Sequence, residues 1–77
     1  MNFQEFVHSK GITQMQLAES MGCTRAHISL WATGENFPTP KSINKMVDGF
    51  AKLDKEVTYD DLYISLLQTK KEKGAQP

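Results

Sequence analysis

Residues 25–33 of this sequence combine a hydrogen-bonding face with an apolar face at the spacing of a helix. With Ile28 as the inward reference, a rotation of about 100° per residue brings Trp31 to the same inner side. The opposite side and its flanks carry Arg25, Ala26, Ser29 and Leu30. Arginine pairs bidentately with guanine, a hydroxyl donates or accepts, and small apolar groups pack on thymine methyl groups. We therefore expect this face to read base edges in a DNA groove, whereas a helical phase shifted by one residue would place Leu30 in the core.

Three polar residues around this stretch are suited to phosphate rather than to bases. Gln14 stands at the start of the preceding helical segment, where its amide and the free backbone N–H groups favour an anion. Thr24 can cap the next helix and also touch a phosphate. For His27, contact with phosphate and simple exposure both remain open, whereas a metal-ligand role lacks a second His or Cys at ligand spacing.

Catalytic chemistry has no comparable basis in the sequence. It contains no paired carboxylates at a plausible cleft, no nucleophile with a nearby base and no glycine-rich loop for phosphates. The adjacent Asp60 and Asp61 are explained by the favourable interaction of acidic side chains with the start of a helix. We therefore expect no enzyme activity, no catalytic residue, no metal and no cofactor.

The elements that must position these residues are five predicted helices, at residues 2–9, 14–21, 25–33, 40–53 and 59–71. The start signals are Asn2 with Glu5, Thr13 with Gln16, Thr24, Thr39 with Pro40, and Thr58. A strand over residues 57–64 is the minor alternative, because Val, Thr, Tyr and Ile favour strands, and the two adjacent aspartates argue against it. We expect an all-α fold in which the second and third helices form a helix-turn-helix.

Length and composition indicate one small domain. The chain has 77 residues and 39% hydrophobic content, and we place the domain at residues 1–69 and a disordered tail at 70–77. The single cysteine, Cys23, suits a reducing cytoplasm better than a disulfide framework. We expect a cytoplasmic protein, because no secretory segment opens the chain and no apolar run approaches the ~20 residues of a membrane span.

The charge balance is neutral, with nine Lys and Arg against nine Asp and Glu, whereas DNA-binding domains are usually basic. The basic groups nearest the predicted reading helix are Arg25, His27, Lys41 and Lys45, and four acidic residues lie downstream at 54–61. A dipolar molecule of this kind can present one side to phosphate while its net charge is zero.

The segment from Gly11 to about Pro40 resembles the helix-turn-helix of the Cro and phage-repressor (Xre-like) family. The matching residues are Thr13-Gln14, Leu17-Ala18, Met21-Gly22-Cys23-Thr24, Ile28-Ser29, Trp31, Gly34 and Pro38. The five-helix plan extends the likeness to about Leu67. The resemblance implies a compact, lambda-repressor-like all-α domain that binds double-stranded operator DNA, usually as a dimer.

Carried over position by position, the resemblance implies a backbone contact at Gln14 and base contacts at Arg25, Ala26 and Leu30. It also implies phosphate contacts after the reading helix, at Asn36, Phe37 and Lys41. The implied function is a sequence-specific transcriptional regulator, most simply a repressor that occupies a palindromic operator. Activation, and a phage or a chromosomal origin, remain open.

The last predicted helix has more apolar surface than one core face requires. Tyr63, Ile64 and Leu67 widen its apolar arc to about 200°. We expect these three residues to form a homodimer interface, and the alternative is that a small domain wraps more of its last helix. An alternative function for the whole chain is that of an antitoxin or adaptor whose main role is to bind another protein. The neutral net charge slightly favours this alternative.

Overall fold

The computed structural model describes residues 1–74, which form five α-helices and no strand. They are α1 (Phe3–Ser9), α2 (Gln14–Met21), α3 (Arg25–Thr33), α4 (Pro40–Lys52) and α5 (Tyr59–Gly74). The predicted all-α class is confirmed for these residues, and the strand reading of residues 57–64 is wrong. None of the five helices combines the length and hydrophobicity needed to cross a lipid bilayer. Residues 75–77, the end of the predicted tail, lie outside the described residues.

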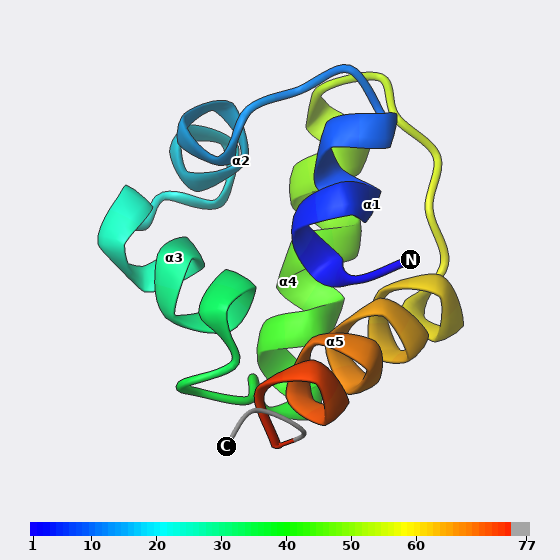
Figure 1. Ribbon diagram of the computed structural model, residues 1–77. Coiled ribbons are helices and arrows are strands. Elements are labelled where there is room, and N and C mark those ends of the chain that lie inside the picture. The colour runs from blue at the N-terminus through cyan, green and yellow to red at the C-terminus, as the bar shows by residue number, and fades with distance from the viewer. Residues whose placement is uncertain (75–77) are drawn as a thin grey trace.

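Helix α4 lies at the centre of the molecule, with α2 and α3 on one side, α1 in front and α5 crossing its lower part (Figure 1). All five helices contribute to one apolar core, which includes Phe3 and Val7 of α1, Leu17 of α2, Ile28 and Trp31 of α3, Phe50 of α4 and Leu62 and Leu66 of α5. The short helices α2 and α3 therefore take their positions from the longer α4 and α5 behind them.

Helix α2 approaches α4 closely at Gly49, which is buried in the last turn of α4. A Cβ atom on Gly49 would lie 2.7 Å from Cγ of Met21 and 3.0 Å from Oγ of Ser20. A glycine costs up to about 1 kcal/mol in a helix relative to alanine. Here it permits a close approach of the two helices that any larger side chain would prevent.

A tight turn at Gly22 joins α2 to α3. Gly22 has a φ of 73°, in the left-handed region that favours glycine. The N–H of Cys23 donates a hydrogen bond to the carbonyl of Ala18 at 3.0 Å, which caps the C-terminal end of α2. The side chain of Thr24 then caps the start of α3. Local hydrogen bonds thus end α2 and begin α3 within one short turn.

Helix α5 continues to Gly74 instead of ending near residue 71, so residues 70–74, which the sequence assigned to a disordered tail, are helical. Tertiary contacts hold this last part. The buried Thr69 hydroxyl accepts the Phe3 N–H at 2.8 Å, and the Glu72 carboxylate accepts Nδ2 of Asn2 at 2.9 Å. The end of α5 is therefore tied to the start of α1.

Candidate functional site

Helix α3 buries one side and leaves the other side open. Ile28 is fully buried and Trp31 is 4% exposed, so the predicted inward side is confirmed. Leu30 is 37% exposed, which rules out the alternative that placed it in the core. The open side presents Arg25, Ala26, Leu30 and the half-buried Ser29. A row of mostly small or flexible side chains therefore faces solvent along α3.

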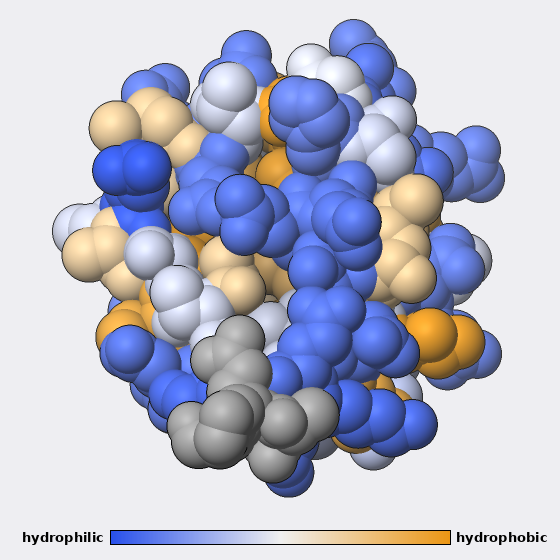
Figure 2. Space-filling model, viewed as in Figure 1, coloured by the Kyte–Doolittle hydropathy of each residue, from blue (hydrophilic) through white to orange (hydrophobic). Residues whose placement is uncertain are grey.

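The surface over α2 and α3 is chemically mixed. On the left of Figure 2, weakly polar and apolar areas interrupt a face that is otherwise hydrophilic. No acidic residue occurs in the first turn of either helix. A mixed surface without carboxylates at the two helix starts suits contact with both base edges and phosphates.

The start of α3 carries Thr24 and His27, both exposed. The hydroxyl oxygen of Thr24 accepts the His27 N–H at 3.3 Å, and its own proton stays available to donate. The imidazole of His27 packs edge-on against Trp31, with ring centroids 4.9 Å apart. Both side chains thus lie at the rim of the open side of α3.

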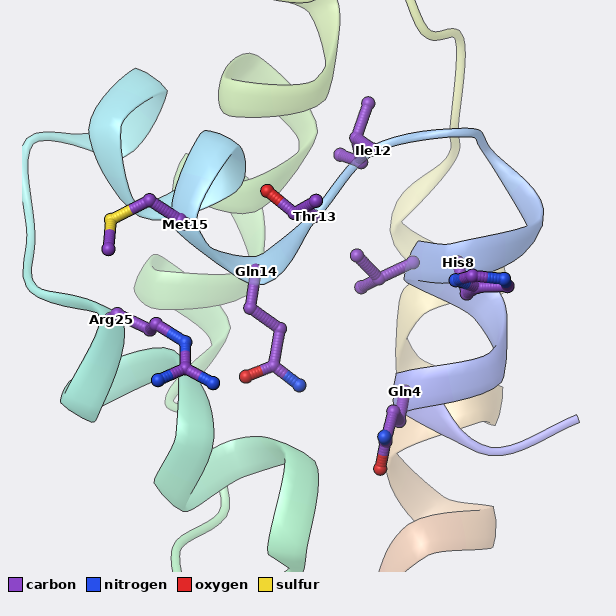
Figure 3. Close-up of a pocket in the computed structure, with 8 residues that line it drawn as sticks. Gln4, His8, Ile12, Thr13, Gln14, Met15 and Arg25 are labelled. Carbon is purple, nitrogen blue, oxygen red and sulfur yellow. The ribbon is translucent and has the colours of Figure 1, made fainter.

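The start of α2 is rigidly capped beside Arg25. The Thr13 hydroxyl accepts the Gln16 N–H at 3.1 Å, and the Gln16 side chain accepts the Thr13 N–H at 2.8 Å. Gln14 follows, half-buried, and its amide extends toward the same opening as the Arg25 guanidinium (Figure 3). The fold thus brings together Gln14 and Arg25 from two consecutive helices.

Helix α1 forms the other wall of this opening. A cleft of about 270 Å³ separates the helices, and Gln4 and His8 line it from α1 opposite Gln14 and Arg25. Sequence reasoning missed Gln4 and His8, although their four-residue spacing on a predicted helix was a visible signal that they share one face.

The loop after α3 places Asn36 and Lys41 at the surface. The N–H of Asn36 bonds to the Leu30 carbonyl at 3.2 Å, while the side chains of Asn36 and Lys41 are exposed. Lys41 lies in the first turn of α4, which Thr39 caps. Both residues are therefore accessible on the segment that follows α3.

Phe37 joins this loop to α5 in an aromatic patch, defined here as Phe37, Tyr59, Tyr63 and Lys70. The Phe37 and Tyr63 rings meet edge-on at 5.9 Å, and Tyr59 and Tyr63 stack at 6.2 Å. The Lys70 ammonium lies 5.5 Å from the Phe37 ring centroid. Among the predicted interface residues, Tyr63 is 40% and Ile64 63% exposed, and Leu67 is half-buried.

Metal and thiol chemistry find no support in residues 1–74. No group of three or more His, Cys, Asp or Glu side chains that could hold a metal occurs there. Partial burial raises the pKa of the Cys23 thiol, which disfavours its thiolate form.

The fold and the surface define a small five-helix all-α protein in which two consecutive short helices share an open face. Comparisons of this chain with protein-family models, with curated proteins and with solved structures found no match.

Proposed function

We propose that this chain is a sequence-specific DNA-binding transcriptional regulator of the helix-turn-helix type, similar to the Cro and phage-repressor (Xre-like) family. It acts by binding and not by catalysis. Helix α3 enters the major groove, and α2 lies across the sugar–phosphate backbone. The simplest mode of action is repression, in which the protein occupies an operator that overlaps a promoter.

One observation carries this proposal: α3 buries Ile28 and Trp31 while Arg25 and Ala26 stay exposed at its first turn. The major groove is about 12 Å wide and accepts one helix. In this arrangement Arg25 pairs with guanine, Ser29 hydrogen-bonds a base, and Ala26 and Leu30 pack on thymine methyl groups. The backbone contacts come from Gln14, Thr24, His27, Asn36 and Lys41.

The neutral net charge is compatible with this role because the charges are unevenly placed. The first turns of α2 and α3 contain no acidic residue, whereas Asp60 and Asp61 lie in the first turn of α5. In Figure 1 that end of α5 lies across the molecule from α2 and α3. The starts of the two helices proposed to face DNA therefore carry no acidic side chain.

A homodimer completes the proposal. Tyr63, Ile64 and Leu67 form the interface, and a two-fold axis would place the two α3 helices about 34 Å apart, in successive turns of the groove. The operator is then expected to be palindromic, because each copy reads one half-site.

The decisive experiment is selection of bound sequences from a random pool of DNA duplexes, followed by affinity measurements over a salt series. A palindromic consensus and a steep loss of affinity with salt are the expected results. Equal recovery of all sequences, with weak binding at low salt, would contradict sequence-specific regulation.

A second candidate is an antitoxin or adaptor whose main role is to hold another protein. The observation that favours it is the exposed aromatic patch, which joins the loop after α3 to α5. A stoichiometric complex with the product of a neighbouring reading frame, lost on Tyr63→Ser but kept on Arg25→Ala, would support this role. The reverse dependence would exclude the aromatic patch as the partner site.

A further inference from the structure

Helix α5 carries an aliphatic side chain on the side that points away from the core. Its buried side is formed by Leu62, Ser65, Leu66 and Thr69. At about 100° per residue, Ile64 lies roughly opposite the centre of this buried side. Charged and polar residues usually occupy such positions on a surface helix. The fold of one chain therefore leaves Ile64 largely in water at the middle of α5.

A straight row of four residues runs along this side of α5, here called the outer stripe: Asp60, Ile64, Leu67 and Lys71. Their spacing of four, three and four residues keeps them within an arc of about 60° on the helix. Asp60, Ile64 and Lys71 are exposed, and Leu67 is half-buried. The outer stripe thus has a negative end, an apolar middle and a positive end.

The helix dipole explains either charged end of the outer stripe when it is taken alone. Acidic residues are favourable in the first turn of a helix and basic residues in the last turn, and α5 has both. The dipole does not require Asp60 and Lys71 to share one narrow face, or an exposed Ile64 to lie between them. Both features are expected of a surface that binds a second copy of itself.

The outer stripe is complementary to its own reverse. Residues 60 and 71 have the same midpoint as residues 64 and 67, which falls between residues 65 and 66. A two-fold axis at that point brings Ile64 of one copy to Leu67 of the other, and Asp60 to Lys71. A parallel pair of helices would instead place Asp60 against Asp60 and Lys71 against Lys71, which is repulsive.

We infer that two copies pack α5 against α5 in antiparallel orientation, with Ile64–Leu67 contacts at the centre and an Asp60–Lys71 ion pair at each end. This inference rests on the homodimer of the proposed function, and it adds the orientation of the two copies and a dependence on salt. The apolar centre supplies the attraction, and the two ion pairs select the register. Because exposed ion pairs are screened by salt, the dimer weakens as the ionic strength rises.

An antiparallel contact of this kind leaves the end of α3 accessible. Lys73 follows Ile64 by nine residues, so the two side chains lie on opposite sides of α5. Cβ of Lys73 would lie 3.2 Å from a Cβ atom on Gly34, the residue that ends α3. The outer stripe therefore faces away from the end of α3, and a second copy seated on it does not cover Gly34.

The test reverses the charges of the outer stripe and measures self-association without DNA. The proteins are Asp60→Lys, Lys71→Asp, their equimolar mixture and the double variant, which keeps the net charge of zero. Asp48→Lys, at an exposed position on α4, changes the net charge as Asp60→Lys does and is the matched control. Sedimentation equilibrium at low and high salt gives the dimer dissociation constant, and circular dichroism checks that each variant keeps its helices.

Each single reversal is expected to raise the dimer dissociation constant about tenfold at low salt, because it turns two attractive pairs into two repulsive ones. High salt should weaken the parent dimer and reduce the difference between the parent and the single variants. The mixture and the double variant should both regain the dimer, since each places opposite charges at both ends of the contact. Asp48→Lys should associate as the parent does.

Three outcomes would overturn the inference. If the parent forms a dimer and the single reversals leave its dissociation constant unchanged, the homodimer stands, but the Asp60–Lys71 pairing is wrong. A loss that neither the mixture nor the double variant reverses would exclude the pairing as well. If the parent stays monomeric at high micromolar concentration in low salt, both the homodimer and its antiparallel contact fail. Selection of bound DNA sequences would then still decide whether α3 reads DNA, so the two failures are distinguishable.

Discussion

Arg25 occupies the position with the greatest consequence for the proposed function. It is exposed at the first turn of α3, close to Gln14 in the first turn of α2. A guanidinium has five donors in a planar fork, so it can pair with guanine and also donate a hydrogen bond to a neighbouring amide oxygen. The two residues are therefore expected to affect binding in different ways.

Arg25→Ala is expected to weaken binding to the selected operator by about 1–3 kcal/mol and to relax the preference at one base position. Gln14→Ala should weaken binding to all sequences more evenly, because a phosphate contact carries no sequence information. Competition binding with operator and random duplexes measures both effects. If Arg25→Ala discriminates between the two duplexes as well as the parent does, Arg25 does not read a base.

Gly49 is the residue on which the packing of α2 depends. Alanine there would gain up to about 1 kcal/mol of helix propensity, but its Cβ would lie 2.7 Å from Cγ of Met21. Overpacking of this kind costs about 1–3 kcal/mol. We therefore expect Gly49→Ala to lower the free energy of unfolding by about 1 kcal/mol, as measured by urea denaturation.

The control for Gly49 is the same substitution in a Met21→Ala background. Removing Cγ of Met21 relieves the closest contact, so Gly49→Ala should be less harmful there than in the parent. An equal loss of stability in both backgrounds would show that the contact with Met21 does not determine the glycine requirement.

At the scale of elements, the end of α5 holds the start of α1 in place through side-chain hydrogen bonds. The Thr69 hydroxyl accepts the Phe3 N–H and donates to the Ser65 carbonyl, at 2.8 Å and 3.1 Å. Glu72 adds a bond from Asn2, and hydrogen bonds from Asn2 and Gln68 lower the pKa of its carboxyl group. The stabilisation from Glu72 is therefore present when this group is ionised and is lost as the pH falls through its lowered folded-state pKa.

Thr69→Val keeps the volume of the side chain and removes the acceptor of the Phe3 N–H. Because this N–H bond is buried, its loss is expected to cost about 1–3 kcal/mol of unfolding free energy. Chemical denaturation monitored by circular dichroism provides the measurement. Thr33→Val, at an exposed position near the end of α3, is the matched control and should change stability little.

At the scale of the whole molecule, the main question is self-association. A domain of this size buries only about 60% of the surface of its unfolded chain, so a dimer interface would add useful stability. Ile64 is 63% exposed on α5, next to Tyr63 of the aromatic patch. An aliphatic side chain so open to water is the natural place to test the proposed interface.

Ile64→Ser is expected to shift the protein from dimer to monomer without unfolding it, because the side chain makes little contact with the core. Analytical ultracentrifugation over a concentration series measures this shift. The control is Met15→Ser on α2. Met15 is also a large apolar residue and is 49% exposed, and its replacement should leave the dimer intact. A parent that stays monomeric at high micromolar concentration would remove the dimer from the proposal.

The helix starts were predictable because their signals are local. The capping boxes of α1 and α2 join residues three positions apart, so the sequence shows both partners at once. The same holds for Thr24 before α3 and Thr39 before α4. The inward side of α3 was predictable as well, because helical rotation relates Ile28 to Trp31 without any knowledge of the other helices.

The sequence alone thus determined the all-α class, the bounds of α2 and α3 and the side of α3 that faces solvent, because interactions within one or two helical turns decide these features. Only the tertiary structure decided how far α5 extends and that Gln4 and His8 of α1 line the same cleft as Gln14 of α2. Those features depend on contacts such as Phe3–Thr69 and Asn2–Glu72, which join residues 66 and 70 positions apart. No local pattern encodes such contacts, since they arise only when the packed core brings the two ends of the chain together.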